Sequence, residues 1–404
     1  MILQRHGRKR LLLSYEMNVH PGDTLRELLH SLDRWTLPIR DRVAPGQAFG
    51  IVPRVGRKLL QELRTQKARR TLQEKLATKN FFLYTVNAFP IGNFHARRVK
   101  EQVYSPPWTH GERARLTNQV VDLLAELLPQ DEVGTISTLG GTYRPWGNTR
   151  QDHERMAVNY LRTVEHMARM ALKGGPTVLL AVEPEPDTTL ETMRDVIHLV
   201  DNFLRPLIPQ RLARPLGVSR SRAEELFHCH FTVNLDVCHL SVLFRDPVRE
   251  WRALEKAGLK VGKLHITNAL ALPRPGRSPT ALAELKSYDE PRYLHQFAAR
   301  RPGGELVRGG DLSELCRSVV ADTEEVRVHF HVPLSRARMG RLSTTRSSTS
   351  QVLHHTLRHP HPPHLAIETY TWPIISRDKD NLVDGIVREF RWVLREMNGK
   401  REGA

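Results

Sequence analysis

The sequence predicts an α/β fold, a (β/α)8 TIM barrel, and two observations support this prediction. Strand-like apolar runs alternate with amphipathic helical segments along most of the 404 residues, which is typical of a parallel sheet with crossover helices. Several of these runs end in an acidic residue or a histidine, and TIM barrels keep their active sites at the C-terminal ends of their strands. With 40% hydrophobic residues, the chain can also bury a sizeable core.

Nine segments have the composition of strands, one more than an eight-stranded barrel holds. They are residues 11–19, 49–55, 81–89, 134–139, 177–183, 231–236, 260–267, 326–332 and 364–370. One of them must lie outside the barrel, and the two candidates are 49–55 and 326–332. Apolar periodicity predicts helices over 57–79, 118–129, 151–172, 190–206 and 381–397.

The domain organisation that follows is a single barrel domain over residues 11–397. The segment 270–325 is long and irregular, with RPGRSPT near its start, and we expect it to be an insertion at the catalytic face, where such barrels vary. Residues 1–10 and 398–404 are expected to be tails.

Charge and cysteine content narrow the class of protein. Three cysteines without a CxxC pair argue against a disulfide framework or a zinc ribbon. No apolar run approaches the length of a membrane span, and the basic N-terminus lacks a signal-peptide core, so a soluble cytoplasmic protein is expected. The net charge of +17 favours solvated helix faces over a phosphate-binding face, and no interleaving of aromatic and basic residues indicates binding of single-stranded nucleic acid.

Carboxylates at three strand ends predict a metal site. Glu183, Asp236 and Glu368 each close an apolar run that should be buried. One such residue alone is more often a structural hydrogen-bonding or ion-pairing group, but three on separate strands favour a shared role. Carboxylate and imidazole ligands together suit Mn²⁺, Mg²⁺, Fe²⁺, Co²⁺ or Zn²⁺.

Histidines near the same strand ends are candidates for further ligands or for acid–base work. His239 forms a D-x-x-H spacing with Asp236, and His265 lies within a strand, where a core histidine is the ordinary alternative. His329 and His331 are two apart, so on a strand they share a face and can act as two ligands or as a ligand and a general base. The alternative is that His329 and His331 are simply polar residues on the solvent-facing side of a half-buried strand.

Loops after the strands supply candidates for substrate binding, although each alone is more often plain loop structure. The six candidates are His20, Asn87, His95, Arg292, His295 and Trp372.

Several motifs together resemble the EboE-type metabolite traffic proteins, which belong to the xylose isomerase-like TIM barrel superfamily with sugar-phosphate isomerases, epimerases and endonuclease IV. The motifs are VNAFPIGNFH, VKEQVYSPPW, ISTLGGTY, AVEPEP, LDVCHLSV, EPRYLHQ, HFHVPL and IETYTW, and the resemblance covers about residues 11–397. It implies a role in moving a metabolite out of the cytoplasm, with peripheral contact to membrane partners of that export pathway.

The resemblance also implies roles for individual residues. The divalent metal ligands of the superfamily fall on Glu183, Asp236, His265 and Glu368, and the histidine of the D-x-x-H motif falls on His239. The pair that binds a further metal in the endonuclease relatives falls on His329 and His331. Here the sequence departs from those enzymes, which carry Asp at the first of these two positions.

Three functions are compatible with these residues. The first is a metal-dependent isomerase, epimerase or lyase acting on a small metabolite, with Glu183 or Glu368 as the proton shuttle and His239 and His331 as further catalytic groups. The second is a carrier or scaffold that holds a metabolite without turnover. The third is a phosphodiesterase like endonuclease IV, against which the missing Asp counts, so that nucleic acid is not the expected partner.

Overall fold

The computed structural model describes residues 1–3, 10–375 and 381–398, and it confirms the TIM barrel. The remaining residues of the predicted tails, 4–9 and 399–404, lie outside the described residues. Parallel strands form one curled sheet in the order β2-β16-β9-β8-β7-β6-β5. These strands are β2 (Leu11–Tyr15), β5 (Thr85–Asn87), β6 (Gly134–Leu139), β7 (Val178–Glu183), β8 (Phe231–Asp236), β9 (Val261–Ile266) and β16 (His364–Ile367).

A short parallel pair closes the barrel between β2 and β5. The pair consists of β3 (Phe49–Ile51) and β4 (Phe81–Leu83). Isolated parallel bridges from Glu16 to Val52 and from Arg54 to Asn87 connect it to both neighbours. The segment 49–55 is therefore part of the barrel wall. A two-residue strand, β1 (Ile2–Leu3), lies antiparallel beside β2.

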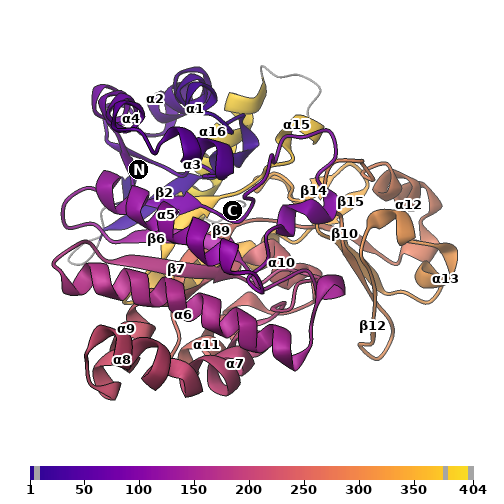
Figure 1. The fold of residues 1–404 in the computed structure, drawn as a ribbon. Coiled ribbons are helices and arrows are strands. Elements are labelled where there is room, and N and C mark those ends of the chain that lie inside the picture. The colour runs from indigo at the N-terminus through magenta and orange to yellow at the C-terminus, as the bar shows by residue number, and fades with distance from the viewer. Residues whose placement is uncertain (4–9, 376–380, 399–404) are drawn as a thin grey trace.

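Helices cover the outside of the barrel (Figure 1). They are α1 (Leu25–Ser31), α2 (Leu37–Val43), α3 (Arg57–Glu62), α4 (Gln66–Thr78), α5 (Gly111–Leu127), α6 (Arg150–Leu172), α7 (Met193–Leu199), α8 (Arg214–Leu216), α9 (Arg220–His230), α10 (Val237–Val242), α11 (Pro247–Lys256), α14 (Arg346–Arg358), α15 (Trp372–Ile375) and α16 (Asn381–Met397). The predicted helix over 57–79 is two helices. The longest, α6, begins at a capping box formed by Thr149 and Asp152 and ends before Gly174, whose φ is +85°.

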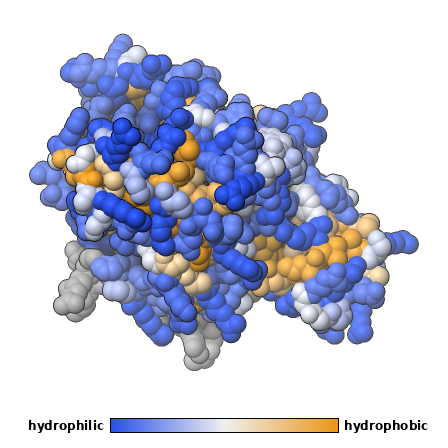
Figure 2. Space-filling model, turned by 60° about the horizontal axis from the view of Figure 1, so that its bottom comes forward, coloured by the Kyte–Doolittle hydropathy of each residue, from blue (hydrophilic) through white to orange (hydrophobic). Residues whose placement is uncertain are grey.

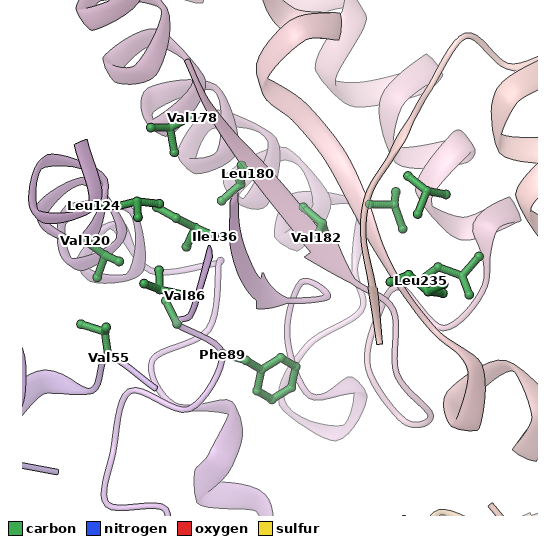
Figure 3. Close-up of a cluster of buried hydrophobic side chains, with 14 of the residues drawn as sticks. Val55, Val86, Phe89, Val120, Leu124, Ile136, Val178, Leu180, Val182 and Leu235 are labelled. Atoms are coloured by element: carbon green, nitrogen blue, oxygen red, sulfur yellow. The ribbon is translucent and has the colours of Figure 1, made fainter. Parts of the chain in front are cut away.

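The core between strands and helices follows the apolar periodicity of the sequence. Figure 3 shows Val120 and Leu124 of α5 packed toward Ile136 of β6 and Val86 of β5, with Leu180 of β7 beside them. All five side chains are buried. Burial of this apolar surface is the main force holding the helical layer to the sheet.

The insertion forms a second, antiparallel sheet in the order β12-β11-β13-β10-β15-β14. Its strands are β10 (Leu270–Pro273), β11 (Phe297–Arg300), β12 (Leu306–Gly309), β13 (Glu325–Val328), β14 (Arg338–Met339) and β15 (Leu342–Thr344), with helices α12 (Pro279–Lys286) and α13 (Arg317–Val320). It projects on the right in Figure 1. The sheet runs past residue 325, the predicted end of the insertion, to Thr344. The segment 326–332 therefore belongs to the insertion.

The insertion packs directly on the barrel near α10. Ala298 of the sheet contacts an apolar cluster that includes Cys238 and Val242. Arg327 donates a hydrogen bond to the carbonyl oxygen of Ser241, and its guanidinium lies 4.2 Å from the centroid of the Phe244 ring. These contacts fix the insertion over the strand ends, where it can contribute to a site.

The surface in Figure 2 is mostly hydrophilic, with hydrophobic residues gathered in limited areas, one of them on the side of the insertion. Within the described part of the chain, no helix combines the length and hydrophobicity needed to cross a membrane.

Candidate metal centre

Four buried side chains converge at the C-terminal mouth of the barrel. Glu183 and Asp236 are the last residues of β7 and β8, His265 lies in β9, and Glu368 directly follows β16. One ligand atom from each lies within 4.8 Å of those of the other three. His265 Nδ1 is 3.0 Å from Glu183 Oε1, 3.1 Å from Glu368 Oε2 and 3.6 Å from Asp236 Oδ2. The structure thus brings together the four residues predicted as primary metal ligands.

Hydrogen bonds orient the carboxylates of Asp236 and Glu368. Asp236 Oδ1 accepts from the backbone N–H of His239 at 3.0 Å and from Thr267 Oγ1 at 2.7 Å. Its Oδ2 is buried and finds no hydrogen-bond partner among the described residues. Glu368 Oε1 accepts from Asn18 Nδ2 at 2.7 Å. One oxygen of each carboxylate is therefore anchored while the other faces the centre.

His265 is held from behind by a carboxylate that the sequence analysis did not single out. Its Nε2 lies 2.9 Å from Glu16 Oε1, which also accepts from Lys263 Nζ at 2.5 Å. Lys263 Nζ donates further to Ser137 Oγ at 3.0 Å. A carboxylate behind a ligating imidazole fixes its tautomer, leaving the Nδ1 lone pair for a metal.

The electrostatics of the cluster indicate a cation site. Burial lowers the pKa of His265, but the carboxylates of Glu368 and Glu183 outweigh burial and hold that pKa well above its usual value. Burial raises the pKa of Asp236, but His239, His331 and His265 outweigh it and hold the pKa below its usual range. The carboxylates around His265 thus favour a positive charge at the centre of the cluster. The unpartnered Asp236 oxygen and this three-carboxylate, one-imidazole donor set fit a divalent ion.

Three further histidines approach the cluster from one side. The Nδ1 atoms of His239, His329 and His331 lie 2.9, 2.8 and 3.0 Å from Pro184 O, Gln296 Oε1 and Glu368 O, respectively. Each oxygen can only accept, so Nδ1 carries a proton in all three rings, and Nε2 carries the lone pair when the ring is neutral. Within the described residues, the buried Nε2 atoms of His329 and His331 have no hydrogen-bond partner.

Glu185 and Asp236 each form a further group of possible metal ligands with two of these histidines. Glu185, His239 and His329 have one ligand atom each within 4.8 Å of one another, and so do Asp236, His239 and His331. Glu185 thus brings a carboxyl oxygen close to His329.

A cavity of about 70 Å³ opens above these groups. Glu183, Glu368, His239, His329 and His331 line it, together with other residues from the β5–α5 loop and the insertion. Of the six residues predicted to bind substrate, Asn87 lines this cavity. Its Oδ1 accepts a hydrogen bond from the backbone N–H of Phe89 at 3.0 Å.

Two of the other predicted substrate residues lie beside the barrel mouth. His20 follows a 3-10 turn over Met17–Val19 that carries it away from the cavity. Its ring stacks on Trp35 with centroids 4.7 Å apart, and Tyr15 Oη lies 3.0 Å from its Nε2. His95 is half-buried, and its pKa is lowered by burial and by the charge of Arg54.

The remaining three are engaged within the protein. Arg292 is half-buried, with its guanidinium 5.8 Å from the centroid of the Tyr293 ring. His295 is buried with Nδ1 3.0 Å from His329 O and Nε2 3.1 Å from Glu290 Oε1. Trp372 donates its indole N–H to Glu389 Oε2 at 2.8 Å and is packed in the core. None of these three lines the described cavity.

Gly140 lets the end of β7 approach the loop that follows β6. A Cβ there would lie 2.5 Å from Glu183 O and 3.0 Å from Leu190 O, both backbone atoms. We expect Gly140→Ala to push these segments apart, to lower the free energy of unfolding by ~1–3 kcal/mol, and to weaken metal binding through Glu183. Urea unfolding and metal titration test this. Gly92→Ala is the control, because a Cβ at Gly92 meets nothing within 4 Å.

Comparison with known proteins shows similarity at the level of fold. No family model and no curated protein matches the sequence. A xylose isomerase-like TIM barrel protein from Mycobacterium smegmatis, solved in complex with magnesium, is similar with a TM-score of 0.52 and 9% identity, over 96% of this chain and 97% of that one. The IolI protein with a bound zinc atom has a TM-score of 0.48 and 10% identity, over 98% of this chain and 100% of that one. The similarity to the Mycobacterium smegmatis protein shows that the fold is a TIM barrel of the xylose isomerase-like kind.

Proposed function

We propose that this protein is a divalent-metal-dependent enzyme that performs isomerase, epimerase or lyase chemistry on a small metabolite. The observation that carries the proposal is the buried cluster of three carboxylates and one imidazole beneath a cavity at the mouth of the barrel. Burying three carboxylates together is costly unless a cation compensates them. Active sites of such barrels lie at this end of the strands.

The residues that would hold the ion are Glu183, Asp236, His265 and Glu368. His239 and His329, with Glu185, are the residues that would hold a second ion. When bound, a divalent ion supplies a Lewis acid that polarises the carbonyl of a hydroxy-carbonyl substrate. Mn²⁺, Mg²⁺, Fe²⁺, Co²⁺ and Zn²⁺ all suit this mixture of oxygen and nitrogen ligands.

Proton transfer is assigned to side chains that line the cavity. For an isomerisation, Glu183 or Glu368 takes a proton from the carbon next to the carbonyl and returns it to the neighbouring carbon. For an epimerisation, one of the two takes the proton and the other delivers a proton to the same carbon from the opposite face. His331 takes the hydroxyl proton and delivers it to the former carbonyl oxygen. Burial lowers the pKa of His331, which keeps the imidazole neutral and able to accept that proton. His239 is the alternative group for this second transfer.

The test is metal content together with proton exchange. Untagged protein analysed by mass spectrometry should contain at least one divalent ion per chain, and Asp236→Asn and Glu368→Gln should lose it while circular dichroism stays unchanged. Glu250→Gln removes a carboxylate on α11 that bonds the Met193 N–H, and it is the matched control. Metal-dependent exchange of deuterium into a panel of hydroxy-carbonyl compounds should follow.

Other outcomes distinguish the alternatives. A chain that neither contains nor takes up metal would overturn the metalloenzyme proposal. Metal and metabolite binding without deuterium exchange would identify a carrier. Metal-dependent cleavage of a duplex with an abasic site would identify a phosphodiesterase.

Membership of the EboE-type proteins, action in the cytoplasm and contact with membrane partners of an export pathway are further parts of the proposal. Motifs such as VNAFPIGNFH, LDVCHLSV and IETYTW support them. Accumulation of an unexported metabolite in cells that lack the protein would test this role, and unchanged export would count against it.

A further inference from the structure

The wall of the cavity above the metal ligands is largely apolar and aromatic. The residues with carbon surfaces on it are Phe89, Pro90, Phe94, Val103, Tyr104, Tyr293, Leu294 and Tyr370. They come from the β5–α5 loop, from the insertion and from the segment after β16. Three of them pack as one surface, since the Phe94 ring lies 4.8 Å from that of Tyr293 and 5.7 Å from that of Tyr370, and the two tyrosine rings are 5.0 Å apart.

Two of the tyrosine hydroxyls in this wall already have partners within the protein. Tyr104 donates to Glu185 Oε1 at 3.0 Å, and Tyr293 donates to the backbone oxygen of Phe94 at 3.2 Å. Since these hydroxyls are engaged, the two side chains offer mainly ring carbon to a ligand. Such surfaces bind hydrocarbon or a ring by removing apolar area from water.

Within the described residues, the cavity offers a phosphate no unpaired lysine or arginine. Among the described residues that line it, Lys100 is the only lysine or arginine. Its Nζ is 2.5 Å from Asp311 Oδ2 and 3.1 Å from Glu290 O, so its charge is already paired in a buried position. The carboxyl groups of Glu183 and Glu368 stand on the same wall. A phosphate placed there would lose its hydration without gaining the charged donors that usually replace it.

We propose that the substrate is a compact, non-phosphorylated molecule with two adjacent oxygens and a ring or hydrocarbon body. The adjacent oxygens, a hydroxyl beside a carbonyl, face the metal ligands, and the body lies against Phe94, Tyr293 and Tyr370. The cavity volume of about 70 Å³ leaves room for a small molecule only, which is why the substrate is compact. This inference rests on the proposed metal-dependent function and narrows its substrates away from sugar phosphates.

A series of three hydroxyketones tests this inference. All three carry a hydroxyl beside a carbonyl. Relative to dihydroxyacetone, 2-hydroxyacetophenone has a phenyl ring in place of one hydroxymethyl group, and dihydroxyacetone phosphate has a phosphate on one hydroxyl. Calorimetric titration of Mn²⁺-loaded protein should show the phenyl compound binding at least ten times more tightly than dihydroxyacetone, and the phosphate compound no more tightly. Removal of the metal should weaken the binding of all three compounds.

Variants separate the wall from the metal. Leu294 is a half-buried residue of the wall. Leu294→Ala and Phe94→Ala should each weaken binding of the phenyl compound several-fold and leave the affinity for dihydroxyacetone unchanged. Leu172→Ala, at a side chain with 44% exposure on α6, is the control. The proposed substrate class would be overturned if the phosphate compound bound ten times more tightly than dihydroxyacetone, or if the phenyl compound bound no more tightly than dihydroxyacetone. Neither result would contradict the metal site. Failure to bind Mn²⁺ would instead overturn the function on which the inference rests.

Discussion

Replacement of Glu16 by glutamine is expected to lower the free energy of unfolding by ~3–5 kcal/mol, because it leaves the charge of Lys263 buried without a counter-charge. Both side chains of this pair are fully buried, and they lie inside the barrel directly beneath His265. Ser137, the other partner of Lys263, is neutral and cannot compensate the ammonium group. Urea unfolding of the metal-free protein measures the loss.

The double variant Glu16→Gln/Lys263→Met separates stability from metal binding. It removes both charges and should recover most of the lost stability, since buried ion pairs are often replaceable by apolar groups at little cost. Its metal affinity should remain ~10–100-fold below that of the wild type, because the carboxylate that orients His265 is gone. Equal metal affinity in the double variant and the wild type would show that Glu16 has only a structural role.

The position of Glu16 also shows that a residue closing an apolar run in the sequence lies near the barrel mouth. Glu183, Asp236 and Glu368 were found because each closes an apolar run, and the barrel geometry brings such residues to one mouth. Glu16 closes the run LLLSY in the same way. His20, the residue of that segment predicted to bind substrate, is separated from the strand end by the 3-10 turn over Met17–Val19.

The position of the insertion's residues at the site could not be predicted from the sequence. The spacing of His329 and His331 predicted a shared face, and both reach the cavity. Their position depends on strand pairing across the whole insertion, since the backbone N–H of His329 bonds to Gln296 O and that of Val332 to Asn268 O. Such distant pairing leaves no local signal, and periodicity alone cannot say that Trp372 turns toward Glu389 and away from the mouth.

Metal binding should strengthen with pH, about tenfold per pH unit, as long as His265 holds a proton in the free protein. Glu368 and Glu183 overcome the effect of burial and raise the pKa of His265 well above its usual value, so below that pKa an ion must displace one proton. The lowered pKa of Asp236 means that this carboxylate adds no further proton.

Affinity for Mn²⁺ measured by competition with a chelator between pH 6 and 8 gives the slope of this dependence. In His265→Gln, an amide oxygen replaces the imidazole and nothing titrates there, so the affinity should be lower and its dependence on pH shallower by about one proton. The variant therefore distinguishes a proton held by His265 from one held elsewhere. An identical slope in both proteins would mean that the displaced proton comes from another group, with His239 as the first to examine, because Asp236, Glu185 and Glu183 overcome the effect of burial and raise its pKa as well.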